Sequence, residues 1–248
     1  MKKLIGILLI IAMLAGFSAL AEDGENLVDK DISFGIFKLG GTFDEARAAE
    51  YISGISFNAY AYTGRMVGDA YGDNMVYYVY GSDHVAQSFS AWGDSKTVAG
   101  YDVSPRLYFT YPIVDGHFQQ DENTAVLIGG QYEFSYDIDA ESAFTDLQSK
   151  LTSTYGDPWK ESTSADELWG AVELPDNYEW IKDDIAQLDA HYVVWKSSTN
   201  GVEVVLSVFT RYDERRVSLS YIYPAMDEEI IAAHNNVQST ASTSTDGL

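Results

Sequence analysis

One polar stretch of the chain, residues 157–190, carries large aromatic residues of types that suit ligand binding. Its aromatic residues are Trp159, Trp169, Tyr178 and Trp180, and they stand among many Asp and Glu residues. Aromatic faces stack on sugars and hold cationic groups. This composition predicts a ligand-binding loop at these four residues. The alternative is that the same rings pack as a lid over the rest of the fold.

Recognisable catalytic and metal-binding motifs are missing from the sequence. It contains no Gly-x-Ser-x-Gly, His-Glu-x-x-His, Gly-x-x-x-x-Gly-Lys or Gly-x-Gly-x-x-Gly. The four histidines (His84, His117, His191 and His234) are scattered, and there is no cysteine. The sequence therefore predicts no catalytic residue, no metal ligand and no cofactor.

Carboxylates at alternate positions from Asp137 to Glu141 allow two interpretations. Calcium loops use such spacing, but the loop glycine and the distal Glu of an EF-hand are missing. Asp137 or Asp139 as a helix N-cap, with Glu141 in the first helical turn, explains the same residues. No pair of carboxylates stands out as an acid and a base. We therefore expect a non-enzymatic binding or interaction protein, with a carbohydrate- or envelope-directed hydrolase as the alternative.

Residues Met1–Ala21 have the three parts of an export signal. Lys2 and Lys3 precede an apolar run, and Ala19-Leu-Ala21 offers a small-residue cleavage site. We expect cleavage after Ala21 and a soluble, secreted or otherwise extracytoplasmic product; an uncleaved anchor is the alternative. No later stretch is apolar enough to span a bilayer, and without cysteine no lipoprotein anchor can form.

The charge of the chain limits its partners. It has 38 Asp and Glu against 15 Lys and Arg, a formal net charge of −23, and loss of Lys2 and Lys3 makes it two units more negative. Such charge argues against nucleic acid or an anionic membrane as a partner. A protein or a glycan remains, and cationic groups on it are permitted.

A strand followed by a helix is the best-specified local unit. Tyr132, Phe134 and Tyr136 alternate with polar residues, which predicts a strand with one buried face. The next apolar residues share one helical face, and they are Phe144, Leu147, Leu151 and Tyr155. Gly156 and Pro158 then end the helix.

The same order of elements occurs twice and predicts the fold class. An alternating segment at 32–36 precedes a capping box at Thr42–Glu45, much as in the later unit. We expect an α+β fold with a mainly antiparallel sheet, a few helices on one face and two similar halves, 31–114 and 124–237. Residues 157–190 form an insertion in the second half, and 238–248 a disordered tail. Two independent α+β halves, or one all-β sandwich, are the alternatives.

The layout resembles that of small exported bacterial proteins of uncharacterised function. It rests on the signal, the helix carried by Phe144, Leu147 and Leu151, the Tyr155-Gly-Asp-Pro158 ending and the strands that follow. Doubled, the layout is similar to the beta-lactamase inhibitor protein fold, and the resemblance implies two helix-plus-sheet repeats with a concave binding face. The paired cysteines of that family are absent here, so no functional residue is carried over.

Overall fold

The computed structural model describes eight stretches of the chain and five further residues. The stretches are 26–49, 52–56, 60–62, 76–78, 88–119, 121–163, 190–211 and 213–226, and the further residues are 229, 230, 232, 233 and 236. The predictions for the signal and the tail concern residues outside this part, as does most of the insertion.

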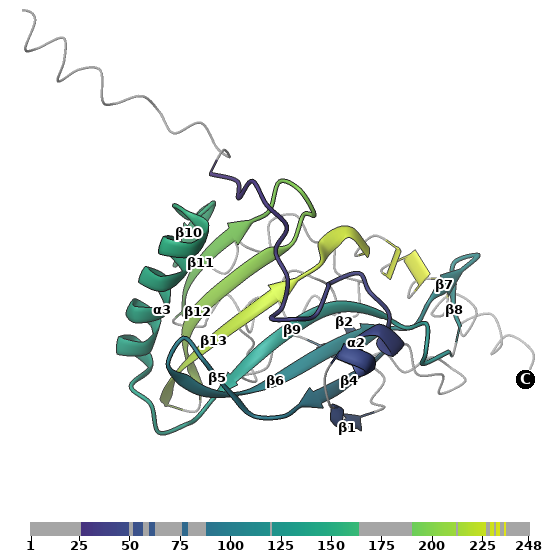
Figure 1. The fold of residues 1–248 in the computed structure, drawn as a ribbon, viewed down its shortest axis with the longest axis horizontal. Coiled ribbons are helices and arrows are strands. Elements are labelled where there is room, and N and C mark those ends of the chain that lie inside the picture. The colour runs from purple at the N-terminus through teal and green to yellow at the C-terminus, as the bar shows by residue number, and fades with distance from the viewer. Residues whose placement is uncertain are drawn as a thin grey trace, which may run out of the picture.

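A nine-stranded antiparallel sheet forms the framework of the protein (Figure 1). Its strands, in spatial order, are β1 (Ile52–Ser56), β4 (Ser88–Gly93), β6 (Tyr101–Thr110), β9 (Val126–Phe134), β13 (Glu214–Ile222), β12 (Glu203–Arg211), β11 (Ala190–Lys196) and β10 (Lys160–Ser162), with β5 (Lys96–Val98) paired beside β6. Two short pairs are separate, β2 (Tyr60–Tyr62) with β3 (Val76–Tyr78) and β7 (Ile113–Val114) with β8 (His117–Phe118). The predicted α+β class with a mainly antiparallel sheet is confirmed. The similarity of the two halves stays a prediction, although their strands join in one sheet through β6 and β9.

Helix α3 (Ala140–Tyr155) follows β9 as predicted. Asp139 is its N-cap, and its Oδ1 accepts a hydrogen bond of 3.0 Å from the backbone N–H of Ser142. Phe144, Leu147 and Leu151 are buried against the sheet, and Gly156 ends the helix with a φ of 86°. The local sequence therefore fixes both ends of this helix and its apolar face.

The first predicted strand, at 32–36, is wrong, whereas the helix after it is confirmed. Gly35 has a φ of 59°, which turns the chain so that Phe34 and Phe37 pair with each other across a tight loop. In α2 (Phe43–Ala49), the Thr42 N–H donates to Glu45 Oε2 at 2.9 Å, and the Glu45 N–H donates to Thr42 Oγ1 at 3.3 Å. The capping box therefore acts as expected, while the alternating segment before it does not join the sheet.

Two strands of the sheet run through residues that disfavour a strand interior. β6 continues without a break through Pro105. On one side of β6, the partner changes from β5, whose first residue lies opposite Val103, to β4, whose last paired residue lies opposite Arg106. Pro105 falls in the interval between them, so its missing N–H interrupts no ladder there. β9 likewise runs unbroken from Val126 to Phe134, through Gly129 and Gly130.

The two described helices cover the same face of the sheet (Figure 1). This face is apolar, and at its centre the N-terminal segment lays Phe34 across β9. A Cβ on Gly130 would lie 2.3 Å from Phe34 Cδ1, so glycine is required for this close approach. The Phe34 ring centre lies 4.5 Å from that of Tyr132 and 5.4 Å from that of Tyr221. The N-terminal segment thus packs directly onto the middle of the sheet.

The opposite face carries polar side chains at the same central strands. Its buried members on β4, β9, β12 and β13 are Ser90, Gln131, Ser207, Ser218 and Ser220. The Tyr108 hydroxyl donates to Gln131 Oε1 at 2.9 Å, and Gln131 Nε2 donates to Ser218 Oγ at 3.1 Å. These hydrogen bonds connect β6, β9 and β13, and they give the buried side-chain amide of Gln131 hydrogen-bond partners.

Candidate ligand-binding cleft

A cleft opens where the two central strands of the sheet separate. Only residues Gly129–Tyr132 of β9 pair with β13, where they lie opposite Leu219–Ile222. β13, in contrast, is paired with β12 along its whole length. Beyond that pairing, the end of β9 and the start of β13 border a cavity of about 550 Å³. Cavities of this size are common ligand sites. The separation of paired strands thus creates a cavity in the middle of an otherwise continuous sheet.

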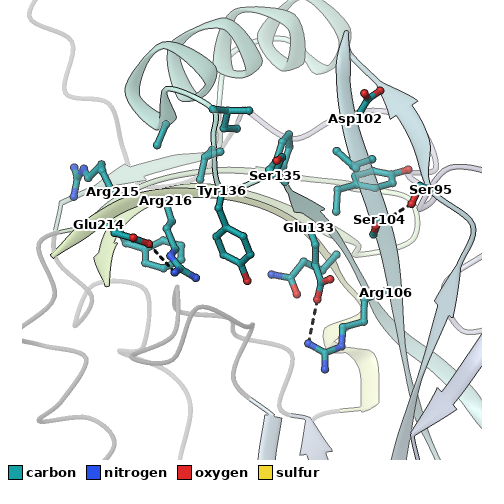
Figure 2. Close-up of a pocket in the computed structure, with 18 residues that line it drawn as sticks. Ser95, Asp102, Ser104, Arg106, Glu133, Ser135, Tyr136, Glu214, Arg215 and Arg216 are labelled. Carbon is teal, nitrogen blue, oxygen red and sulfur yellow. Dashed lines mark hydrogen bonds and ion pairs between the residues drawn. The ribbon is translucent and has the colours of Figure 1, made fainter. Parts of the chain in front are cut away.

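Charged side chains of both signs line this cleft in equal numbers. The cations are Arg106, Arg215 and Arg216, and the anions are Asp102, Glu133 and Glu214. Figure 2 shows Arg106, Glu133, Tyr136, Arg216 and Glu214 together on the side of the sheet away from α3. Arg215 also donates to Glu141 Oε1 at 2.6 Å, so the two signs are nearly balanced here among the described residues, in contrast to the strongly acidic chain as a whole.

Arg106 and Glu133 form the first ion pair of the cleft, on the β6–β9 side. Arg106 Nη1 lies 3.2 Å from Glu133 Oε1, and the Arg106 side chain is only 15% exposed. The guanidinium of Arg106 also lies over the rings of Trp92, at 5.1 Å, and Tyr108, at 5.6 Å. These contacts hold the arginine in place, since each restricts the plane of its head group.

Arg216 and Glu214 form the second ion pair, on the β13 side. Arg216 Nη2 donates to Glu214 Oε2 at 3.0 Å, and the Glu214 side chain is 66% exposed. The Arg216 guanidinium lies 4.5 Å from the centre of the Tyr136 ring. Its Nε is buried and has no hydrogen-bond partner among the residues that the structure describes. A buried donor without an acceptor is costly, so this edge of the guanidinium is suited to receive a ligand oxygen.

Tyr136 corrects one part of the predicted strand. Its alternation with Phe134 and Tyr132 predicted a buried ring, but β9 ends at Phe134 and Tyr136 is 81% exposed. Ser135 and Tyr136 belong to the connection that leads to α3, and the ring lies beside Arg216 instead of in the core. Because the strand ends before Tyr136, this side chain no longer follows the alternation of strand residues between the two faces of the sheet.

Two phenols with raised pKa values belong to the core and not to the cleft. Burial raises the pKa of Tyr221 well above its ordinary value, and burial also raises the pKa of Tyr155, whose hydroxyl is hydrogen-bonded to that of Tyr221. Neither residue lines the cavity. Because a raised pKa keeps a phenol protonated at neutral pH, neither hydroxyl is poised to act as a base.

The structure places one of the four sequence-predicted binding residues. Trp159 is half-buried against the core, and the ammonium of Lys196 lies 4.7 Å from its ring centre. Lys196 is also paired with Glu203 at 2.7 Å. One face of Trp159 is therefore occupied by a cation of the chain itself. Trp169, Tyr178 and Trp180 lie outside the described residues, so this loop stays a prediction.

Sequence reasoning missed Arg106 and Arg216. Both lie at polar positions of alternating strands, in Ser104-Pro-Arg106-Leu-Tyr108 and in Arg216-Val-Ser218-Leu-Ser220. Arginine is scarce in this acidic chain, and within a strand it must reach a partner or a ligand across one face. An arginine at such a position was therefore the feature of the sequence that could have indicated a site. The separation of β9 from β13, which brings the two arginines to one cleft, has no signature in either strand alone.

Comparisons with protein-family models, with curated proteins and with solved structures found no match for this chain. The resemblance to exported bacterial proteins and to the beta-lactamase inhibitor layout therefore stays a prediction. In the described part of the chain, no helix has both the length and the apolar character needed to cross a membrane. Across the same residues, no cluster of three His, Asp or Glu side chains is arranged to hold a metal ion.

Proposed function

We propose that this protein is a non-enzymatic extracytoplasmic binding protein whose ligand occupies the cleft between β9 and β13. The observation that carries the proposal is Arg216, whose buried Nε lacks an acceptor among the described residues while its guanidinium is held by Glu214 and Tyr136. A rigid, partly buried cation beside a cavity of ligand size is what recognition of a small polar molecule requires.

The two glutamates on this side of the sheet favour binding over hydrolysis. A glycosidase needs one carboxyl group that stays protonated as the acid, which requires a raised pKa. Glu133 and Glu214 are each ion-paired with an arginine. Each of these two carboxylates is therefore engaged by a cation of the chain itself. The carbohydrate- or envelope-directed hydrolase is therefore the weaker proposal.

Export is part of the same proposal. The signal predicted at Met1–Ala21 supports release as a secreted or periplasmic protein after cleavage, and the acidic composition suits a soluble product. Amino-terminal sequencing of the protein recovered from culture fluid or periplasm tests this. A chain that still begins at Met1 in the membrane fraction contradicts it.

A ligand screen with matched variants tests the binding function. The purified protein is screened by thermal shift and titration calorimetry against amino acids, short peptides, organic acids, sugars and glycan fragments. We expect one class to bind, and Arg216→Gln to weaken that binding at least about tenfold, as loss of a charge-assisted anchor does. Arg47→Gln is the control, because Arg47 forms an exposed pair with Asp44 on α2.

Two results of this screen contradict the proposal. One is that no class of compound binds. The other is binding that Arg216→Gln leaves unchanged, which places the ligand elsewhere. Mass spectrometry of the incubated compounds supplies a separate readout, because cleaved products favour the hydrolase.

A further inference from the structure

Resting on the proposed binding function, we propose that the ligand is a small zwitterion, an α-amino acid or a short peptide with an apolar side chain. Its carboxylate binds Arg216, and its ammonium group binds Glu214.

The carboxylate position follows from the hydrogen bonding of Arg216. Nη2 is directed to Glu214, while the buried Nε has no acceptor in the described part of the chain. Nε and Nη2 lie on adjoining corners of the planar guanidinium, so one carboxylate can accept from both. The Tyr136 ring lies over this guanidinium, with 4.5 Å between the ring centre and Arg216 Cζ.

The ammonium position follows from the carboxylate that the ligand displaces. A carboxylate on Arg216 competes with Glu214, whose side chain is 66% exposed at the entrance. A simple anion would leave Glu214 without its cation in a chain that already carries a net charge of −23. A zwitterion gives Glu214 a new cation at the same time, so all four charges stay paired.

The net charge of the protein also favours a zwitterion as the ligand. A strongly acidic chain repels anions before they reach the cleft, whereas the two ion pairs on the side away from α3, Arg106–Glu133 and Arg216–Glu214, carry no net charge. A ligand without net charge meets no such barrier. It still finds both signs of charge once it enters.

The remaining lining supplies a place for an apolar side chain. Phe209 lies opposite Arg216 in the register of β12 and β13 and borders the cavity on the same face as that arginine. Val217 and Phe134 alternate with Arg216 and Glu133 and line the gap between the strands from the α3 side, where Ile138 also borders it. A cavity of about 550 Å³ accommodates an amino acid or a dipeptide. Apolar walls with a few convergent polar groups are the usual composition of such sites.

Four related compounds test the inference by titration calorimetry on the full protein. They are phenylalanine, the dipeptide phenylalanylphenylalanine, N-acetylphenylalanine without the ammonium group, and phenylalanine amide without the carboxylate. We expect phenylalanine or the dipeptide to bind at least about tenfold more tightly than either blocked compound. Which of the two binds more tightly distinguishes a free amino acid from a peptide as the ligand.

Two variants assign the ends of the ligand. Arg216→Gln should reduce zwitterion binding at least about tenfold and leave phenylalanine amide unchanged, and Glu214→Gln should leave N-acetylphenylalanine no weaker than before. Arg47→Gln should change none of these affinities, and circular dichroism spectra identical to that of the unmodified protein show that each variant is folded.

The failures of this inference and of the proposed function can be told apart. Equal binding of phenylalanine and N-acetylphenylalanine overturns the ammonium contact and shows a simple anion site. If none of the four compounds binds, but a sugar or another class binds in a way that depends on Arg216, the zwitterion is overturned and the cleft is still a binding site. Silence of the four compounds and of the whole screen overturns both.

Discussion

The guanidinium of Arg216 lies 4.5 Å from the ring centre of Tyr136, although the two residues belong to segments that part from each other in the sheet. Arg216 is on β13, and Tyr136 follows the last residue of β9 by two positions. The contact spans the gap that the missing strand pairing leaves. Where backbone hydrogen bonds no longer join β9 to β13, the contact between Tyr136 and Arg216 connects the two segments and positions the arginine at the cleft.

A double-mutant cycle of Tyr136→Ala and Arg216→Gln should give a coupling energy of about 0.5–1 kcal/mol in the free energy of unfolding, the usual size of an exposed cation–π contact. The measurement is urea unfolding of the two single variants and the double variant. Tyr136→Phe is the control, because it keeps the ring and should keep the coupling. Additive effects would show that the ring and the guanidinium do not interact in solution.

Gly130→Ala should destabilise the protein by about 1–3 kcal/mol, as overpacking of a core does. The added Cβ would lie 2.3 Å from Cδ1 of Phe34, whose ring is fully buried. In a Phe34→Ala background, the same change at Gly130 should cost much less. An equal cost in both backgrounds, measured by urea unfolding, would contradict the contact.

The link between α3 and the β5–β6 hairpin should weaken in acid. Hydrogen bonds from Lys150 and Tyr101 lower the pKa of Asp146 below its ordinary value of 3.8. A lowered pKa in the folded state contributes stability above the unfolded value, and this contribution is lost as the pH falls through the folded value. The stability difference between the unmodified protein and Asp146→Asn should therefore be constant near neutral pH and shrink below about pH 4. Urea unfolding across this pH range measures it, and a difference that does not depend on pH would be the contrary result.

The aromatic insertion makes a separate prediction. Trp159→Ala should lower the free energy of unfolding by about 1–3 kcal/mol, since its ring packs against the core and against Lys196. If the insertion is a binding surface, Trp169→Ala and Trp180→Ala should instead cost roughly 2–4 kcal/mol of glycan or protein binding without a change in unfolding. Thermal unfolding and binding are measured on the same samples. Large falls in melting temperature for Trp169→Ala and Trp180→Ala would favour packing.

Local physics made much of the fold predictable. Asp139, the Leu147 face and Gly156 specify α3 without help from distant residues, and Asn200-Gly201 specifies the hairpin between β11 and β12. The segment around Phe34 was misassigned because its alternation is that of a strand. Gly35 turns the chain there, and the residue on which Phe34 packs, Gly130, belongs to a strand far away in the sequence.

The candidate cleft could not be predicted because it depends on where pairing stops. The sequences of β9 and β13 both continue as strands past their last common pair, at Tyr132 and Leu219. Nothing within either strand marks that point. The arrangement of Arg106, Arg216 and Tyr136 results from that separation in the tertiary structure. The tryptophans of residues 157–190, in contrast, were predicted as binding residues from the local composition alone.

The place of β9 between β6 and β13 has a consequence for how the protein folds. Gln131 on β9 and Ser218 on β13 are hydrogen-bonded across a sequence separation of 87 residues. Closure of so long a loop is slow, and a nascent chain keeps one edge of its central strand unsatisfied until β13 has been synthesised. A chain that ends before Glu214 lacks this partner permanently and exposes an open β edge to other chains. We therefore expect β13, the last strand in the described part of the chain, to limit the folding rate and to protect the central strand from aggregation.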